Sequence, residues 1–290
     1  MHGAAPTAPA VTPSFWEEDD APAEPTRELE DSSPSPGSRL GDYVLGEPLG
    51  QGGQAMVFEA TDAQGQACAV KVLTDVVELE TLKAEARLAL RVRHRNVLRV
   101  ERFVEHPRPF LVMERVEGES LELKLADGVM RWAEFEPIFS QTLDALGAIH
   151  GAGLVHRDVK PSNLLLGSDG RVVLIDFGTA RDRGGLAVVA PTRTGSVRGT
   201  LEFMSPEQLR GEALDARTDL FSLGCVAWLA LTGEFPWRGK GTVTARARME
   251  RDAEPLRAKG LPATASRLIE RLVARDRSAR PASAAACRLG

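Results

Sequence analysis

Two short segments of the sequence, residues 156–163 and 172–178, combine the side chains that in-line phosphoryl transfer requires. That reaction needs a carboxylate to orient the attacking hydroxyl and accept its proton, a cation on the transferred phosphate, and oxygen ligands for a divalent metal ion. The candidates in chain order are Asp158 for the hydroxyl, Lys160 for the phosphate, and Asn163 and Asp176 for the metal ion. This ordered set predicts a phosphotransfer site.

A glycine-rich stretch over residues 50–57 lies between two predicted strands. Glycines such as Gly50 and Gly52 let backbone amides approach phosphate oxygens, because no Cβ intervenes and successive N–H groups form an anion-binding concavity. Ala55 stands where the nucleotide-loop pattern has its third glycine. Taken alone, a glycine-rich hairpin is more often only a turn.

Lys71 lies near the end of an apolar run, residues 67–73. Burying an unpaired ammonium group is costly, so this lysine should have a carboxylate partner. The helix predicted next offers Glu85, fourteen positions further on, and also Glu80 and Glu78 as competitors. Such a pair could hold the ammonium toward nucleotide phosphates, whereas a solvated lysine and an ordinary surface glutamate are the alternative interpretation.

The elements that must position these groups follow from apolar periodicity and turn signals. The patterns predict strands over 43–49, 55–60, 67–73, 97–104 and 109–115, and helices over 77–92, 133–151 and 217–231. Strands dominate the first part and helices the second. We therefore predict an α+β protein in two lobes.

The first forty residues differ in composition from the rest. They hold eight acidic residues against two arginines, together with seven prolines, so their net charge is −6 while the whole chain carries −5. A chain this polar cannot offset its ordering entropy, and we predict a disordered tail over residues 1–41. We expect this tail to act as a solvated linker; the alternative is an autoinhibitory or partner-binding arm.

Composition also excludes several classes of protein and site. No run of 18 apolar residues is present, so we expect no membrane span within these residues. Three widely spaced cysteines argue against a disulfide framework or a zinc site and favour a reducing, cytoplasmic compartment. The near-neutral remainder gives nucleic-acid binding no electrostatic support.

Over about residues 42–290 these motifs resemble the protein kinase family, and in detail the eukaryotic-like serine/threonine kinases of bacteria. The resemblance implies a bilobal fold with a β-rich N-lobe carrying one main helix (42–117) and a larger helical C-lobe (118–290). It implies transfer of the ATP γ-phosphate to serine or threonine of protein substrates, with Mg²⁺ as the metal ion and Mn²⁺ as an alternative.

The resemblance also implies a role for each motif residue. Asp158 would be the catalytic base, Lys160 would neutralise the γ-phosphate, and Asn163 with Asp176 would hold Mg²⁺. The nucleotide-binding set would comprise Gly50, Gly52, Val57, Lys71 and Glu85, together with Glu114 and Val116, whose backbone groups would hydrogen-bond adenine beside the gatekeeper Met113.

Other matches concern scaffold and regulation. Glu207 and Arg280 would form a buried ion pair, Asp219 would hydrogen-bond the backbone around Asp158, and His156 would be architectural. Arg157 directly precedes Asp158, an arrangement that in the family usually means control by phosphorylation of the activation loop. We predict autophosphorylation at Thr194 and secondarily Thr192; the alternative is that these hydroxyls only solvate a loop.

Two alternatives to an active protein kinase stay open. A catalytically inactive kinase-like scaffold would normally have lost Lys71, Asp158 or Asp176, and none is lost. A small-molecule phosphotransferase of similar fold would lack the Gly199-Thr200 and Ser205-Pro206-Glu207 motifs. By analogy, the chain could form a homodimer through its small lobe and could be part of a longer, membrane-anchored kinase.

Overall fold

The computed structural model describes residues 34–51, 55–73, 79–105, 108–178, 180–182, 201–237 and 242–288. Residues 35–290 form one compact unit. The predicted tail lies outside the described residues up to position 33. No described helix is long and apolar enough to span a membrane.

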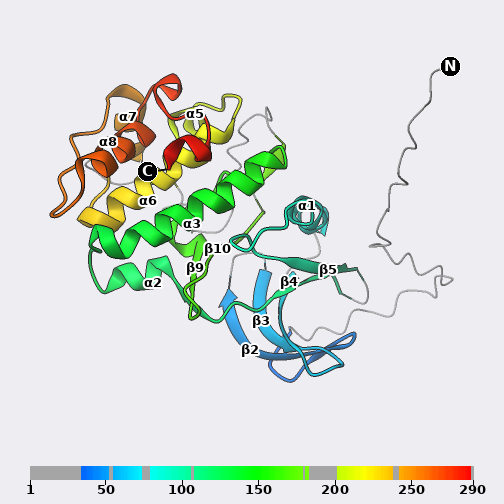
Figure 1. Cartoon of the computed structure of the whole chain (residues 1–290). Helices are drawn as coiled ribbons and strands as arrows, with labels where there is room; N and C mark the ends of the chain where they lie inside the picture. Colours follow the sequence, from blue (N-terminus) through cyan, green and yellow to red (C-terminus); the bar gives the residue numbers. More distant parts are fainter. Residues whose placement is uncertain are drawn as a thin grey trace, which may run out of the picture. The chain divides into compact units, whose positions relative to one another are not determined.

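A six-stranded antiparallel sheet forms the first lobe, in the order β1-β2-β3-β4-β6-β5 (Figure 1). Its strands are β1 (Arg39–Leu40), β2 (Tyr43–Gln51), β3 (Ala55–Thr61), β4 (Ala67–Leu73), β5 (Val100–Val104) and β6 (Phe110–Glu114). The predicted tail was too long at its end, because Leu40 pairs with Tyr43 and is buried. A two-residue strand after a proline-rich stretch carries too little periodicity to be recognised from sequence.

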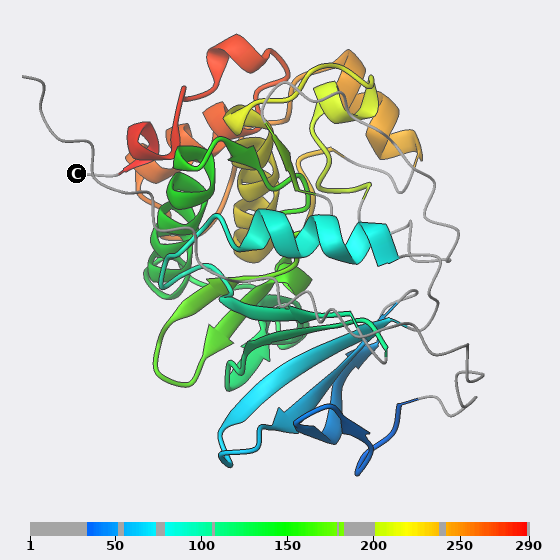
Figure 2. The ribbon, with the colours of Figure 1, turned by 90° about the vertical axis from the view of Figure 1, so that its right-hand side faces the viewer.

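Alternation along β4 sends its side chains to the two faces of the sheet. Val70 and Val72 are buried in a cluster on one face. Ala69 and Leu73 join a cluster on the other face with Leu82 and Ala86 of helix α1 (Leu79–Ala89). Lys71 has the same parity as this second pair. The strand pattern therefore directs its side chain to the face covered by α1, visible beside the sheet in Figures 1 and 2.

Helix α1 is shorter than the predicted 77–92, and residues 74–78 lie outside the described part. The predicted strand over 97–104 also begins late, at Val100. Its first residues bridge the two lobes instead: Val97 pairs with Leu174 in a parallel bridge, and Leu98 N donates to Leu174 O over 3.0 Å.

The second lobe is mainly helical and lies to the left of α1 and the sheet in Figure 1. Its helices are α2 (Leu121–Ala126), α3 (Trp132–Gly151), α5 (Pro206–Leu209), α6 (Ala216–Thr232), α7 (Thr242–Glu250) and α8 (Ala263–Leu272), with 3₁₀ helices η2 (Pro161–Asn163), η3 (Arg277–Ala279) and η4 (Ala284–Cys287). The predicted α+β fold in two lobes is thus observed, and the two long predicted helices match α3 and α6 to within one residue at each end.

Helix α6 is buried along almost its whole length in the core of this lobe. Asp215 caps its N-terminus by accepting from Arg217 N over 2.8 Å, and Gly233 ends it in the left-handed region at φ 72°. At Gly224 a Cβ would lie 2.7 Å from Leu272 Cβ, so glycine permits the close approach of α8. A helix fixed in this way is a rigid base for the loops above it.

Short strands hold those loops. Strands β7 (Gly118–Ser120), β9 (Leu164–Gly167) and β10 (Val172–Leu174) form a three-stranded sheet, and β8 (Leu154–Val155) pairs with β11 (Arg181–Asp182). The loop between β8 and β9 carries Asp158, Lys160 and Asn163, whereas Asp176 follows β10. Because β9 and β10 are paired, the ends of both loops are held close together.

Candidate active site

Lys71 and Glu85 form a short ion pair between β4 and α1. Lys71 Nζ lies 2.7 Å from Glu85 Oε1 and 2.8 Å from Oε2, and both side chains are largely buried. The competing Glu80 is exposed and lies 3.5 Å from Lys83 instead, while Glu78 lies outside the described residues. Burial alone would lower the pKa of Lys71, but the carboxylates of Glu85 and Asp176 raise it above its ordinary value, so the amine is fully charged at neutral pH.

Asp176 is a second carboxylate near the same ammonium group, with its Oδ1 3.7 Å from Lys71 Nζ. Its backbone adopts φ 69°, and its Oδ1 accepts from Gly178 N over 3.0 Å. A Cβ at Gly178 would lie 3.1 Å from that oxygen, so a glycine suits this turn. Burial raises the pKa of Asp176, yet the Lys71 ammonium and the Gly178 amide outweigh it and hold the pKa below its ordinary value.

Asp158, Lys160 and Asn163 converge in the loop between β8 and β9. Lys160 Nζ donates to Asp158 Oδ2 over 2.7 Å, and Asn163 Nδ2 donates to the same oxygen over 3.0 Å and to Asp158 O over 2.8 Å. Asn163 thus directs its amide nitrogen at Asp158, and its carbonyl oxygen is the end suited to a cation. The three predicted residues are therefore brought together in one charged, hydrogen-bonded group.

Asp219, near the start of α6, accepts hydrogen bonds from the backbone of this loop. Its Oδ1 accepts from Arg157 N over 2.7 Å, and its Oδ2 accepts from His156 N over 2.9 Å. Oδ2 also lies 2.8 Å from His150 Nε2 at the end of α3. Burial raises the pKa of Asp219, but His150 and the amide of Arg157 more than offset it, so the pKa lies below its ordinary value. Sequence reasoning missed His150, which carries no motif of its own.

The backbone of the loop is unusual at Arg157, which has φ 72°. Its carbonyl accepts from Gln208 Nε2 of α5 over 2.9 Å. Together with Asp219 this contact holds a conformation that side chains rarely adopt. His156 is fully buried, with Nε2 3.1 Å from Ile175 O and its ring in edge contact with Phe177 at 5.5 Å. His156 therefore joins the loop that carries Asp158 to the one that carries Asp176.

The segment after β6 links the two lobes. Glu114 accepts from Arg99 N over 3.0 Å, and its Oε2 lies 3.1 and 3.2 Å from the terminal nitrogens of Arg171, in the turn between β9 and β10. Arg115 pairs with Glu59 of β3 at 2.7 Å. Arg171 was not identified from the sequence, because a charged turn residue gives no signal before its partner is known.

The remaining predicted nucleotide-binding residues lie along the sheet. Gly50 is opposite Val57 in the β2–β3 register, and open space lies where a Cβ on Gly50 would be. Val57 packs against the cluster under α1, and Met113 is buried in it. Val116 is half-buried just after β6. Gly52, Thr192 and Thr194 lie outside the described residues, as does Thr200.

A buried ion pair anchors the segment that leads into α5. Arg280 donates to both oxygens of Glu207, over 2.7 and 3.0 Å. Thr218 Oγ1 donates to Glu207 Oε1 over 2.9 Å. Burial raises the pKa of Glu207, but the Arg280 guanidinium outweighs this effect and the pKa lies below its ordinary value.

Arg248 of α7 is a second buried cation, and it was not identified from the sequence. It is fully buried and donates to the carbonyls of Leu201, Glu202 and Met204. Its guanidinium carbon lies 5.3 Å from the ring centroid of Trp237. This arginine fixes residues 201–204 in front of α5.

The sequence of this chain is similar to those of known proteins. The sequence model described as the protein kinase domain matches residues 43–289. The chain is 38% identical over 210 residues to the probable serine/threonine-protein kinase PknB of Corynebacterium glutamicum, a match covering 68% of this chain and 32% of that protein. It is 33% identical over 264 residues to the probable serine/threonine-protein kinase PknB of Bifidobacterium longum, covering 84% and 38%.

A third relative is the serine/threonine-protein kinase PknA of Mycobacterium tuberculosis, 35% identical over 252 residues, which cover 82% of this chain and 58% of that protein. The matches therefore span less than two thirds of the length of each of these relatives. The family model, in contrast, covers nearly all of the part that carries the two lobes and the site. On this evidence the chain belongs to the protein kinase family.

Proposed function

We propose that this chain transfers the γ-phosphate of ATP to serine or threonine side chains of protein substrates. The observation that carries the proposal is Lys71 Nζ, which lies 2.7 Å from Glu85 and 3.7 Å from Asp176. In protein kinases the lysine–glutamate pair and the metal-binding aspartate must both be in position for transfer. Because Lys71 already contacts both Glu85 and Asp176, nucleotide phosphates could bind without a movement of α1.

Asp158 is the proposed general base. It would accept the proton of the substrate hydroxyl as the new oxygen–phosphorus bond forms and the bond to the leaving ADP oxygen breaks. Lys160, 2.7 Å from Asp158, would neutralise charge on the transferred phosphate. The contacts of Asp219 with the loop backbone would keep Asp158 in place during the reaction.

Asn163 and Asp176 are the proposed metal ligands. Their donors are a neutral amide oxygen and a carboxylate of lowered pKa, which suit a hard cation. No group of three or more histidine, cysteine or acidic side chains converges among the described residues, and Mg²⁺ typically uses one or two carboxylates plus substrate phosphates. The bound ion would neutralise charge on the phosphates. Mg²⁺ is proposed, with Mn²⁺ as the alternative.

Thr194 and Thr192 are proposed autophosphorylation sites that control activity. Arg157 and Arg181 support this idea: burial and the nearby Arg181 guanidinium both lower the pKa of Arg157. Two guanidinium groups close together would be stabilised by a phosphate.

The compartment and the assembly are also proposals. Cys68, Cys225 and Cys287 are buried free thiols, and burial raises the pKa of each to about 11. The lack of a disulfide among the described residues, which include all three cysteines, supports a reducing, cytoplasmic compartment. A homodimer through the small lobe is proposed on family resemblance, and sedimentation analysis tests it.

The decisive experiment incubates purified chain and its Asp158→Asn variant with ATP and Mg²⁺ and maps phosphosites by mass spectrometry. Phosphate on Thr192 or Thr194 in the wild type and absent from the variant supports both catalysis and regulation. Parallel assays with a casein-like protein and with small alcohols separate a protein kinase from a small-molecule phosphotransferase. ATP binding without transfer to any acceptor would favour the inactive scaffold.

A further inference from the structure

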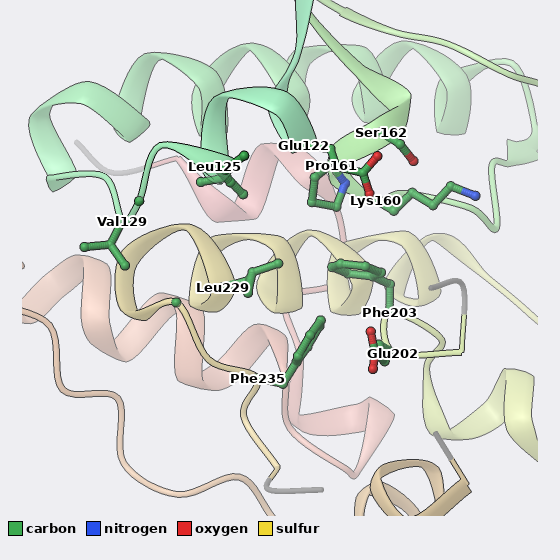
Figure 3. A pocket seen from close by; sticks show the side chains of 13 residues that line it. Glu122, Leu125, Val129, Lys160, Pro161, Ser162, Glu202, Phe203, Leu229 and Phe235 are labelled. Atoms are coloured by element: carbon green, nitrogen blue, oxygen red, sulfur yellow. The ribbon is translucent and has the colours of Figure 1, made fainter. Parts of the chain in front are cut away.

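Two pockets of the second lobe differ in their relation to the proposed active site. One, of about 720 Å³, has Glu122, Glu202 and Lys160 in its lining (Figure 3). It belongs to the proposed active site, because Lys160 Nζ lies 2.7 Å from Asp158 Oδ2. The other, of about 340 Å³, shares no lining residue with it. This second pocket is formed by the end of α5, the start of α6 and the segment after α8.

Four arginines from these three parts of the chain line the second pocket. They are Arg210 directly after α5, Arg217 in the first turn of α6, and Arg275 and Arg277 around the start of η3. A guanidinium group carries five N–H donors in a planar fork that matches the oxygens of phosphate. The second pocket therefore gathers, in a small volume, the side chain best suited to bind an oxoanion.

The protein backbone holds each of these four side chains by one donor. In the chain order of the arginines, the acceptors are the carbonyl oxygens of Met249 at 3.1 Å, Arg277 at 3.4 Å, Glu250 at 3.1 Å and Ala213 at 2.7 Å. A carbonyl directs a guanidinium group without neutralising its charge. The four cations are thus positioned before a ligand binds, which lowers the cost of binding.

The carboxylates that line the same pocket have other partners or lie at a distance. Both oxygens of Glu207 accept from Arg280. Asp276 Oδ1 caps η3 by accepting from Ser278 N over 2.8 Å. Glu212 Oε1 lies 3.7 Å from Arg210 Nη1, which is too far for a hydrogen bond.

The neighbouring carboxylates approach no closer. Asp215 Oδ2 lies 3.8 Å from Arg277 Nε, and Asp252 Oδ1 lies 4.0 Å from Arg275 Nε. In the part of the chain that the structure describes, Arg217 forms no ion pair with a carboxylate. Long, partly exposed ion pairs contribute little, so an anion that accepts short hydrogen bonds from the same arginines would bind more strongly.

We infer that the second pocket binds a phosphate group, carried either by a phosphorylated serine or threonine side chain or by inorganic phosphate. Such a group brings close to two negative charges and three strong acceptor oxygens, enough to contact several of the four arginines at once. A volume of about 340 Å³ lies at the small end of ligand pockets and suits a group of this size. The inference goes beyond the proposed kinase activity, because none of the four arginines has a role in the proposed phosphoryl transfer.

The test titrates the full chain, without ATP and in EDTA, into a fluorescent Gly-Ser-phosphothreonine-Ser-Gly peptide and follows its anisotropy. We expect this peptide to bind at least about tenfold more tightly than its unphosphorylated form, as hydrogen bonds between charged groups would give. The Arg210→Gln, Arg275→Gln double variant should bind it about ten- to thirtyfold more weakly. Equal binding of the two peptides, or wild-type affinity in this double variant, would overturn the inference.

Two controls separate the second pocket from other cationic sites. The Arg99→Gln, Arg131→Gln double variant removes the same charge from exposed ion pairs and should keep the wild-type affinity. The Lys71→Met variant removes a cation of the proposed nucleotide site and should also keep it. Loss of binding in Lys71→Met, with binding kept in the Arg210→Gln, Arg275→Gln variant, would place the phosphate at the nucleotide site and contradict the inference.

Competition by inorganic phosphate identifies the source of the bound group. Displacement of the peptide at a phosphate concentration near the peptide Kd would support a site for the free ion. Displacement only at much higher concentrations would support a site for a phosphorylated side chain. Should the double variant melt early, Arg275→Gln alone gives the same test, because its side chain is 44% exposed. Since ATP is left out, an absence of kinase activity would count against the proposed function without affecting this result.

Discussion

Arg280 and Glu207 lie 73 residues apart in sequence and form a two-pronged ion pair in which the arginine side chain is 0% exposed and the glutamate side chain 3%. The guanidinium carbon also lies 4.6 Å from the centroid of the Phe221 ring, and Nε donates to Ala274 O over 2.8 Å. The pair thus ties the end of the chain to α5 and α6.

Replacing Arg280 by methionine should lower the free energy of unfolding by about 3–5 kcal/mol, because the Glu207 carboxylate would remain buried without its partner. Arg288→Met is the matched control, since Arg288 contacts Asp144 at 2.6 Å but is mostly exposed. That change should cost at most about 1 kcal/mol. Urea titrations measure both. Equal losses in the two variants would contradict this account.

The same pair predicts a pH dependence. The folded-state pKa of Glu207 lies below its ordinary value, so its contribution to stability is present above the unfolded pKa and is lost as the pH falls through the folded pKa. The difference in unfolding free energy between wild type and Glu207→Gln should be largest near neutral pH and shrink below about pH 4. A difference that stays constant down to about pH 3 would refute the prediction.

Glu85→Gln should slow phosphoryl transfer by about ten- to a hundredfold through misplacement of Lys71. Glu80→Gln is the control, because Glu80 is exposed and forms its ion pair with Lys83 rather than with Lys71. Rates in the Lys71→Met background give the decisive comparison. There Glu85→Gln should have little further effect, since both changes remove one interaction. Additive losses would mean that Glu85 acts by another route.

Asp219→Asn should reduce kcat by about ten- to a hundredfold with little change in the KM for ATP. Its two oxygens receive three donors, from His150, His156 and Arg157, and an amide would turn an NH₂ group toward one of them. Asp215→Asn, one turn earlier, is the control because asparagine also caps helices well. A rise in the KM for ATP at unchanged kcat would speak against a loop-positioning role.

Arg171→Gln should raise the KM for ATP by about two- to fivefold with kcat nearly unchanged. The change frees Glu114, whose backbone is proposed to contact adenine, from its partner in the second lobe. Arg99→Gln removes only an exposed pair with Glu101 and serves as control. Nucleotide titration and steady-state kinetics give the readout. Equal KM values in the two variants would exclude Glu114–Arg171 from nucleotide binding.

Local sequence was sufficient for the elements with strong periodicity. The runs of β3, β4, α3 and α6 were predicted within a residue or two of their ends, because alternation and helical spacing reflect which face is buried. Weak local signals gave the errors: β1 was missed, α1 was predicted too long, and the start of the 97–104 run joined Leu174 rather than β6.

The motif residues were also predicted from the sequence, since an ordered set of polar groups at fixed intervals is rare by chance. The choice among Glu78, Glu80 and Glu85 was not settled by composition. Glu85 is buried on α1 beside Leu82 and Ala86, which pack in one cluster with Ala69 and Leu73 of β4. Periodicity placed Glu85 on this face, and packing of the helix on the sheet then brought it to Lys71.

Sequence alone predicted a phosphotransfer constellation and the elements that carry it, and it was sufficient to show the family to which the chain belongs. Only the tertiary structure decided the support of the site: His150 beneath Asp219, Arg171 against Glu114, and Arg248 behind residues 201–204. It also decided that Glu122 and Glu202 share one pocket, 80 positions apart in sequence. Such contacts depend on how distant elements pack, and an isolated charged residue carries no periodic signal of its eventual partner.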